Sequence, residues 1–247
     1  MNKNIKKYAV GAGLLACAAM AGIGAYFTGT DTASDAYTIG SIEIENLFEA
    51  TAAGNTDLTP LQEIDYSSAK IKNVGINDAF VFMTVDIPVA DVYVADLDGK
   101  TEADHSVKEL FVLDTDANMG AGWVELGSAE AITNEGGQTV AMRHVYAYAN
   151  ESNVLTELAP EAETPESIFS VMKFINVADT KADGSAVETE YNIEGRDDLA
   201  VEMVAYGIQT QNVKTDVAFA GDNEDGSTDA SVVWEVVKNA FAIENTK

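Results

Sequence analysis

The chain has 247 residues, of which 41 are acidic and 14 basic, so its formal net charge at pH 7 is −27. Such a charge repels nucleic-acid phosphates and anionic lipid, which argues against both as partners. Apolar residues make up 47% of the sequence, enough to build a folded core instead of a disordered acidic chain.

The first 25 residues have the pattern of an export signal. Lys3, Lys6 and Lys7 form a positively charged start, and residues 8–25 are apolar and rich in Ala and Gly. We expect cleavage near Ala25, which leaves 11 basic residues against 41 acidic ones, a net charge near −30. The cleaved chain would contain no cysteine, so a packed core must stabilise it without disulfides.

Two alternatives for this segment stay open. Residues 8–27 amount to 20 residues, barely enough to span a bilayer, so the segment could be an uncleaved anchor. The second alternative is a lipoprotein, because Leu14, Leu15, Ala16 and Cys17 approach a lipobox in which Cys17 would carry the lipid. The apolar run continues beyond Cys17, where a lipoprotein would have a polar tether, so cleavage near Ala25 fits best.

A flexible leader and a strand follow the apolar run. Residues 28–36 are small and polar, so we expect residues 26–36 to form a mobile leader. Four apolar residues then alternate as they do in a strand: Tyr37, Ile39, Ile42 and Ile44. Their phase shifts by one residue at Gly40, and a glycine inside a strand often marks a bulge.

Residues 25–44 therefore have a fixed order: Ala-Tyr-Phe, small polar residues, an aromatic residue, a glycine and a strand. This order resembles the processing junction of the TasA/camelysin family, which are surface and biofilm-matrix proteins of Gram-positive bacteria released by a SipW-type signal peptidase. The resemblance implies a jelly-roll fold and processing at Ala25, Tyr26 and Phe27. It also implies assembly into fibres by donor-strand exchange, through a strand that contains Phe27, Tyr37, Ile39, Ile42 and Ile44.

Residues 70–94 contain the clearest structural pattern. A turn at 73–75 precedes residues 79–89, whose apolar side chains point alternately to both faces of a strand. A strand that is apolar on both faces is buried on both, so we expect it deep inside a sandwich. Pro88 cannot donate to a ladder, so the strand should end, bulge or reach an edge there.

Shorter strands and one helix are predicted in the rest of the chain. Turn-forming residues separate five further strands, at 92–97, 109–113, 138–148, 168–177 and 199–209. Residues 179–195 form an acidic excursion that could contain a small hairpin. Residues 231–241 have helical periodicity, with capping residues at 227–229. Many short strands and one late helix predict a single all-β domain over 26–247, an antiparallel sandwich that the resemblance refines to a jelly roll.

No catalytic constellation is visible. Camelysin-like proteins have been classed as metallopeptidases, and zinc hydrolysis usually needs two histidines one helical turn apart with a glutamate. The sequence has no HExxH, and we interpret its two histidines, His105 and His144, as surface residues. It also has no GxSxG nucleophile motif. We therefore expect a protein without enzymatic activity, metal or cofactor.

One acidic loop has the oxygen spacing of a calcium site. Asp114, Asp116 and Asn118 alternate along the chain, and Glu125 follows eleven residues after Asp114. Met119 occupies the sixth position, where a calcium loop needs glycine. An acidic hairpin turn is therefore the preferred interpretation, and calcium binding stays open.

These observations predict an exported structural protein of the cell surface or extracellular matrix, which assembles with itself and with other matrix components. Contact with the membrane is expected only through the signal before cleavage. Two other functions remain as alternatives. One is a surface-displayed binding module for a glycan or a protein, and the other is a camelysin-like metallopeptidase.

Overall fold

A computed structural model describes most of the chain beyond residue 60. It covers residues 44–46, 60–65, 70–95, 106–113, 122–178, 180–181, 183–186, 201–210 and 228–245. Every pairing between its strands is antiparallel, and the helix α3 (Ala230–Ala240) lies near the C-terminus. The predicted all-β antiparallel class with a short late helix is therefore confirmed for this part of the chain.

The strands form one large sheet and two small ones. Their bounds are β1 (Ile44–Asn46), β2 (Glu63–Asp65), β3 (Ile71–Asn73), β4 (Ala79–Val92), β5 (Ser106–Glu109), β6 (Phe111–Leu113), β7 (Trp123–Glu125), β8 (Glu130–Thr133), β9 (Thr139–Tyr148), β10 (Val171–Phe174) and β11 (Glu202–Gln209). The large sheet has the order β11-β4-β9-β7, with β5 paired to β4 and β8 paired to β9. A second sheet has the order β2-β10-β6, and β1 pairs with β3.

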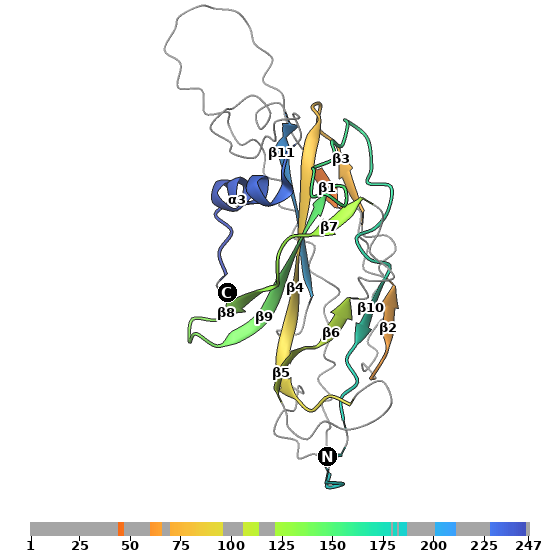
Figure 1. Ribbon diagram of the computed structural model, residues 1–247, viewed down its shortest axis with the longest axis vertical. Coiled ribbons are helices and arrows are strands. Elements are labelled where there is room, and N and C mark those ends of the chain that lie inside the picture. The colour runs from red at the N-terminus through yellow and green to blue at the C-terminus, as the bar shows by residue number, and fades with distance from the viewer. Residues whose placement is uncertain are drawn as a thin grey trace, which may run out of the picture.

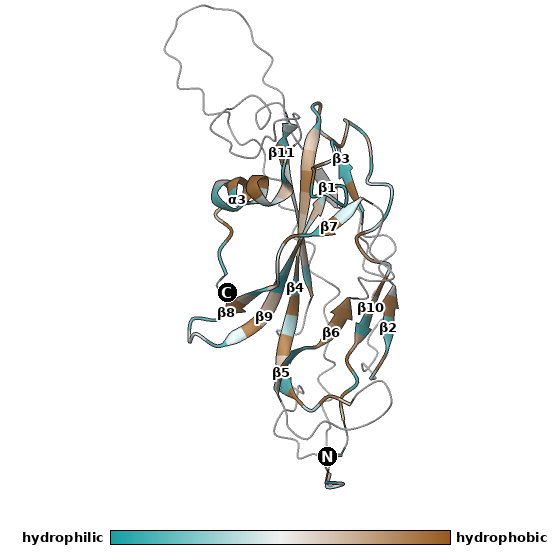
Figure 2. Ribbon diagram, viewed as in Figure 1, coloured by the Kyte–Doolittle hydropathy of each residue, from teal (hydrophilic) through white to brown (hydrophobic). Residues whose placement is uncertain are grey.

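The long strand β4 lies at the centre of this arrangement, with α3 on one side and the second sheet on the other (Figure 1). Hydrophobic colour runs along β4 and along the inward side of α3 (Figure 2). Of the 14 residues of β4, only Asp91 is exposed. The prediction that this strand is buried on both faces is confirmed.

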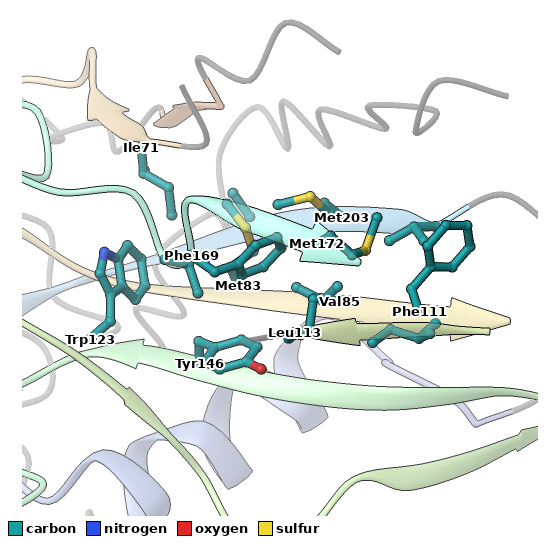
Figure 3. Packing of buried hydrophobic residues seen from close by; sticks show 14 of the residues in the cluster. Ile71, Met83, Val85, Phe111, Leu113, Trp123, Tyr146, Phe169, Met172 and Met203 are labelled. Atoms are coloured by element: carbon teal, nitrogen blue, oxygen red, sulfur yellow. The ribbon is translucent and has the colours of Figure 1, made fainter. Parts of the chain in front are cut away.

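Two hydrophobic cores meet at β4 because its side chains alternate between the faces of the sheet. Val81, Met83, Val85 and Ile87 belong to the core between the large sheet and the second sheet. Phe80 and Phe82 belong to the core beneath α3. Figure 3 shows the first core, in which Met83 and Val85 from β4 lie among aromatic and methionine side chains of neighbouring elements.

Pro88 changes the neighbours of β4 without ending the strand. On one edge, β11 pairs with β4 as far as Asp86, and β5 pairs with it from Val89. The carbonyl of Pro88 accepts a hydrogen bond from the backbone N–H of Leu110 (2.9 Å). Beyond Pro88, the residues that reach the first core shift from odd to even positions, Ala90 and Val92. The expected irregularity is thus a change of face and of partner.

The segment 106–113 links the two layers. Its first half, β5, pairs with β4 in the large sheet, and its second half, β6, pairs with β10 in the second sheet. Leu110 lies buried between them, and its carbonyl accepts a hydrogen bond from Ile175 (3.0 Å). A strand that moves from one sheet to another in this way forms a corner of a sandwich. The sequence predicted a single strand at 109–113, which misses this corner.

The helix α3 begins at a cap that the sequence predicted. Asp229 accepts hydrogen bonds from the backbone N–H groups of Ser231 (2.9 Å) and Val232 (3.2 Å). Trp234 and Val237 are buried against the large sheet, and the ring centroid of Trp234 lies 5.5 Å from that of Phe82. The cap and the apolar face together account for this helix.

Other predicted elements are confirmed with different bounds. β9, β10 and β11 lie inside three of the predicted strands, and Thr180 bridges to Ala186 in the small hairpin. The separate strand predicted for 92–97 is wrong in its start, because Val92 is the last residue of β4. Val94 instead forms a single bridge to Val177.

We predict that Val85→Ala lowers the free energy of unfolding by about 2 to 3 kcal/mol. It removes two buried methyl groups, worth about 0.8 kcal/mol each, and leaves a cavity. Val112→Ala is the matched control, because the Val112 side chain is 52% exposed, and it should cost less than about 0.5 kcal/mol. Denaturant unfolding measures both. Equal losses would contradict the assignment of β4 to the core.

Candidate functional site

Most residues that the sequence singled out lie outside the described part of the chain. These are Cys17, Ala25, Tyr26, Phe27, Tyr37, Ile39, Ile42, His105 and residues 114–120. Three others are placed: Ile44 begins β1 and pairs with Asn73, Glu125 ends β7, and His144 lies in β9. The structure brings Glu125 and His144 together, although the sequence treated them separately.

Arg143 and His144 are neighbours in β9 and point to opposite faces of the large sheet. Tyr146, two residues after His144, belongs to the core shared with the second sheet. Val145, two residues after Arg143, belongs to the core beneath α3. β9 therefore carries one positively charged group into each side of the sheet.

His144 is bonded to two carboxylates. Its Nδ1 lies 2.7 Å from Oε1 of Glu125 at the end of β7, and its Nε2 lies 3.1 Å from Oε1 of Glu109 at the end of β5. Only 16% of the His144 side chain is exposed, so its interpretation as a surface histidine is wrong. Three strands contribute to this cluster, which we call the histidine triad.

The histidine triad keeps His144 protonated. Burial alone lowers the pKa of His144, but the hydrogen bonds and negative charges of Glu109 and Glu125 raise it to about 9. The ring of Tyr146 stacks on that of His144, with centroids 6.4 Å apart. Burial, with the same two carboxylates nearby, raises the pKa of Tyr146, which stays neutral. At neutral pH the triad is thus an imidazolium between two carboxylates.

This arrangement suits a structural role for His144. A doubly protonated ring with both N–H groups bonded has no lone pair for a metal or for general-base catalysis. The carboxylates also lie at opposite edges of the ring. Across the described ranges, no group of three or more His, Cys, Asp or Glu residues could hold a metal ion.

On the other face, Arg143 forms a buried ion pair with Asp86 of β4. Its Nε and Nη2 each lie 2.7 Å from an oxygen of Asp86, which is bidentate geometry. The side chains are 11% and 3% exposed, respectively. Burial opposes the charge of Arg143, but the hydrogen bonds and charge of Asp86 raise its pKa. Asp86 was a signal that the sequence analysis missed, because a lone carboxylate in an apolar strand requires a partner.

A groove of about 600 Å³ lies where β9 and β4 separate beyond Pro88. Its lining is mostly apolar, and Asp91 is the only charged residue in it. The lining residues are Val89, Ala90, Asp91, Val107, Ala131, Asn134, Gln138, Thr139, Val140 and Met142. Val107 and Met142 lie two residues from Glu109 and His144 on their strands, so the groove adjoins the histidine triad.

No family model, curated protein or solved structure matches the chain. Among the described residues, no helix is long and apolar enough to span a membrane. The site is therefore interpreted from its own geometry.

The histidine triad predicts a pH-dependent stability. The folded pKa of His144 is about 9 against an ordinary value of 6.5, so its contribution is complete below pH 6.5 and is lost as pH rises to about 9. That contribution is on the order of 3 kcal/mol. His144→Gln should therefore destabilise the protein at pH 6 much more than at pH 9.5, by denaturant unfolding. Parallel pH profiles of both proteins would contradict the triad.

The buried ion pair predicts a non-additive result. Arg143→Met alone leaves Asp86 charged and unpartnered, and should cost about 3 to 5 kcal/mol of unfolding free energy. The double variant Arg143→Met/Asp86→Leu removes both charges and should recover most of that loss. If the double variant loses the sum of the two single losses, the pair is not coupled as the structure implies.

Proposed function

We propose that this chain is an exported structural protein of the cell surface or extracellular matrix, and that it assembles by adding its N-terminal strand to a neighbouring subunit. The order of residues 1–44 carries this proposal: a positively charged start, an apolar run, a small polar leader and an alternating strand. This order is the part of the chain that resembles the TasA/camelysin family. A jelly roll is the corresponding fold proposal, supported by the two facing antiparallel sheets.

The place of β1 supports exchange of the N-terminal strand. Ile44 is the last apolar residue of the proposed donor strand and the first residue of β1. β1 pairs with β3 over only three residues, Ile44 to Asn46, so few backbone hydrogen bonds hold it. Each such bond contributes about 1 kcal/mol net. The equivalent strand of another subunit could replace β1 without disturbing the large sheet.

The charge of the chain sets a condition for this assembly. With 41 acidic and 14 basic residues, neighbouring subunits repel one another strongly at low ionic strength. Salt shortens the range of that repulsion, to about 10 Å at 0.1 M. Assembly should therefore be favoured by salt and by lower pH.

A surface-displayed binding module is the second candidate, and the groove beside β4 favours it. A volume of about 600 Å³ lies within the usual range for small ligands, and polar groups surround an apolar floor. Such a protein would stay monomeric after export. A fibre-forming protein would polymerise once its N-terminal segment is released.

We predict that the chain starting at Tyr26 forms fibres and that the chain starting at Tyr37 does not. The shorter chain lacks Phe27 and the leader, which would add a strand to the neighbouring subunit. Light scattering and electron microscopy at several salt concentrations measure the difference. Identical fibres from both chains, or no fibres from either under any condition, would rule out donor-strand exchange here.

Export itself has a separate test. The protein recovered outside the cell should begin within two residues of Tyr26 and carry no lipid, by intact-mass measurement. A mature chain that begins at a lipidated Cys17 would make the lipoprotein alternative correct.

A further inference from the structure

The C-terminal segment turns back from α3 and lies beside β8 (Figure 1). At one end of β8, the backbone N–H of Thr133 donates to the carbonyl of Asn245 (3.0 Å). At the other end, the side-chain amide of Asn245 donates to Oε2 of Glu130 (2.7 Å). Within the described residues, β8 has β9 as its only strand partner. The segment 241–245, which we call the C-terminal cap, therefore lies on the edge of β8 away from β9.

Further contacts hold the C-terminal cap from both sides. Arg143, already bonded to Asp86, also donates from Nη1 to the carbonyl of Glu244 (3.0 Å). Lys238 of α3 lies 3.5 Å from Oε1 of Glu130. Phe241 and Ile243, which are partly buried, pack against the core beneath α3. Burial of these apolar groups and several hydrogen bonds thus fix five residues that belong to no strand.

The end of α3 directs the chain toward β8. Ala242 has a left-handed φ of 48°, and the N–H of Ile243 donates to the carbonyl of Lys238 (3.0 Å). This is the hydrogen-bond pattern of a Schellman turn, in which glycine is the usual left-handed residue. Alanine there is strained. The chain therefore maintains an unfavourable backbone conformation while its end is docked on β8.

We propose that the C-terminal cap blocks the edge of β8, and that its removal lets β8 pair with β8 of a second copy of the chain. An open strand edge is a template for another strand. Antiparallel self-pairing of β8 places Glu130 opposite Thr133 and Ala131 opposite Ile132, so no like charges face each other directly. Two equivalent edges joined in this way form a closed twofold dimer. This surface is separate from the N-terminal strand of the proposed function.

The test compares three forms of the exported chain: one with its full C-terminus, one that ends at Ala240, and one that ends at Asn245. The last is the matched control, because it is truncated but retains every contact of the cap. Light scattering coupled to gel filtration should show a doubled mass only for the form that ends at Ala240. A synthetic peptide of residues 241–247 should return that form to the mass of the monomer, and the same peptide with Asn245→Ala should not.

A second variant tests the proposal if the truncated chain does not fold. Asn245→Asp in the full-length chain sets a carboxylate against Glu130 and should displace the cap. The expected results are faster hydrogen exchange at the Thr133 amide and a concentration-dependent dimer. Association through the N-terminal strand would not be reversed by the peptide, so the two modes are distinguishable. A monomeric truncated chain, or dimers that the peptide does not dissociate, would overturn the proposal.

Discussion

Burial of β4 on both faces is the constraint on which the rest of the structure depends. A strand with thirteen of its fourteen residues withdrawn from water needs a layer on each side, and here these layers are α3 and the second sheet. Both layers are small, so neither could bury much apolar surface without the shared strand. The corner at Leu110 then connects the large sheet to the second sheet through a single stretch of chain. The two cores therefore depend on one element and should not be stable separately.

Such a strand can carry a charge only where a partner is built in, which explains the polar side chains of β9. Asp86 lies opposite Arg143 in the register, and Arg143 in turn reaches the C-terminal segment. On the other face, His144 connects the ends of β5 and β7 through two carboxylates. Buried groups of this kind favour one register, because any slip would leave a charge unpaired. Their role in this chain is thus to hold strands in place, while the surface remains strongly acidic.

The sequence predicted what depends on local pattern. The apolar run 79–89 indicated a strand buried on both faces, and Asp229 ahead of an apolar helical face indicated α3. The histidine triad could not be predicted in this way, because its carboxylates lie 19 and 35 residues from His144 and meet it only through the pairing of strands. The strand β8 was missed for a related reason, since its stability comes from β9 and from the C-terminal segment. The N-terminal site residues await a structural test.

Native-state hydrogen exchange tests the central role of β4 most directly. If one strand supports both cores, the amides of β4 should exchange most slowly, and only through global unfolding of the protein. Trp234→Ala, which weakens the core beneath α3, should then lower protection in β4 and in β10 of the opposite layer by the same free energy. Loss of protection confined to α3 and its neighbours, with β10 unchanged, would show that the two cores unfold independently and would contradict this account.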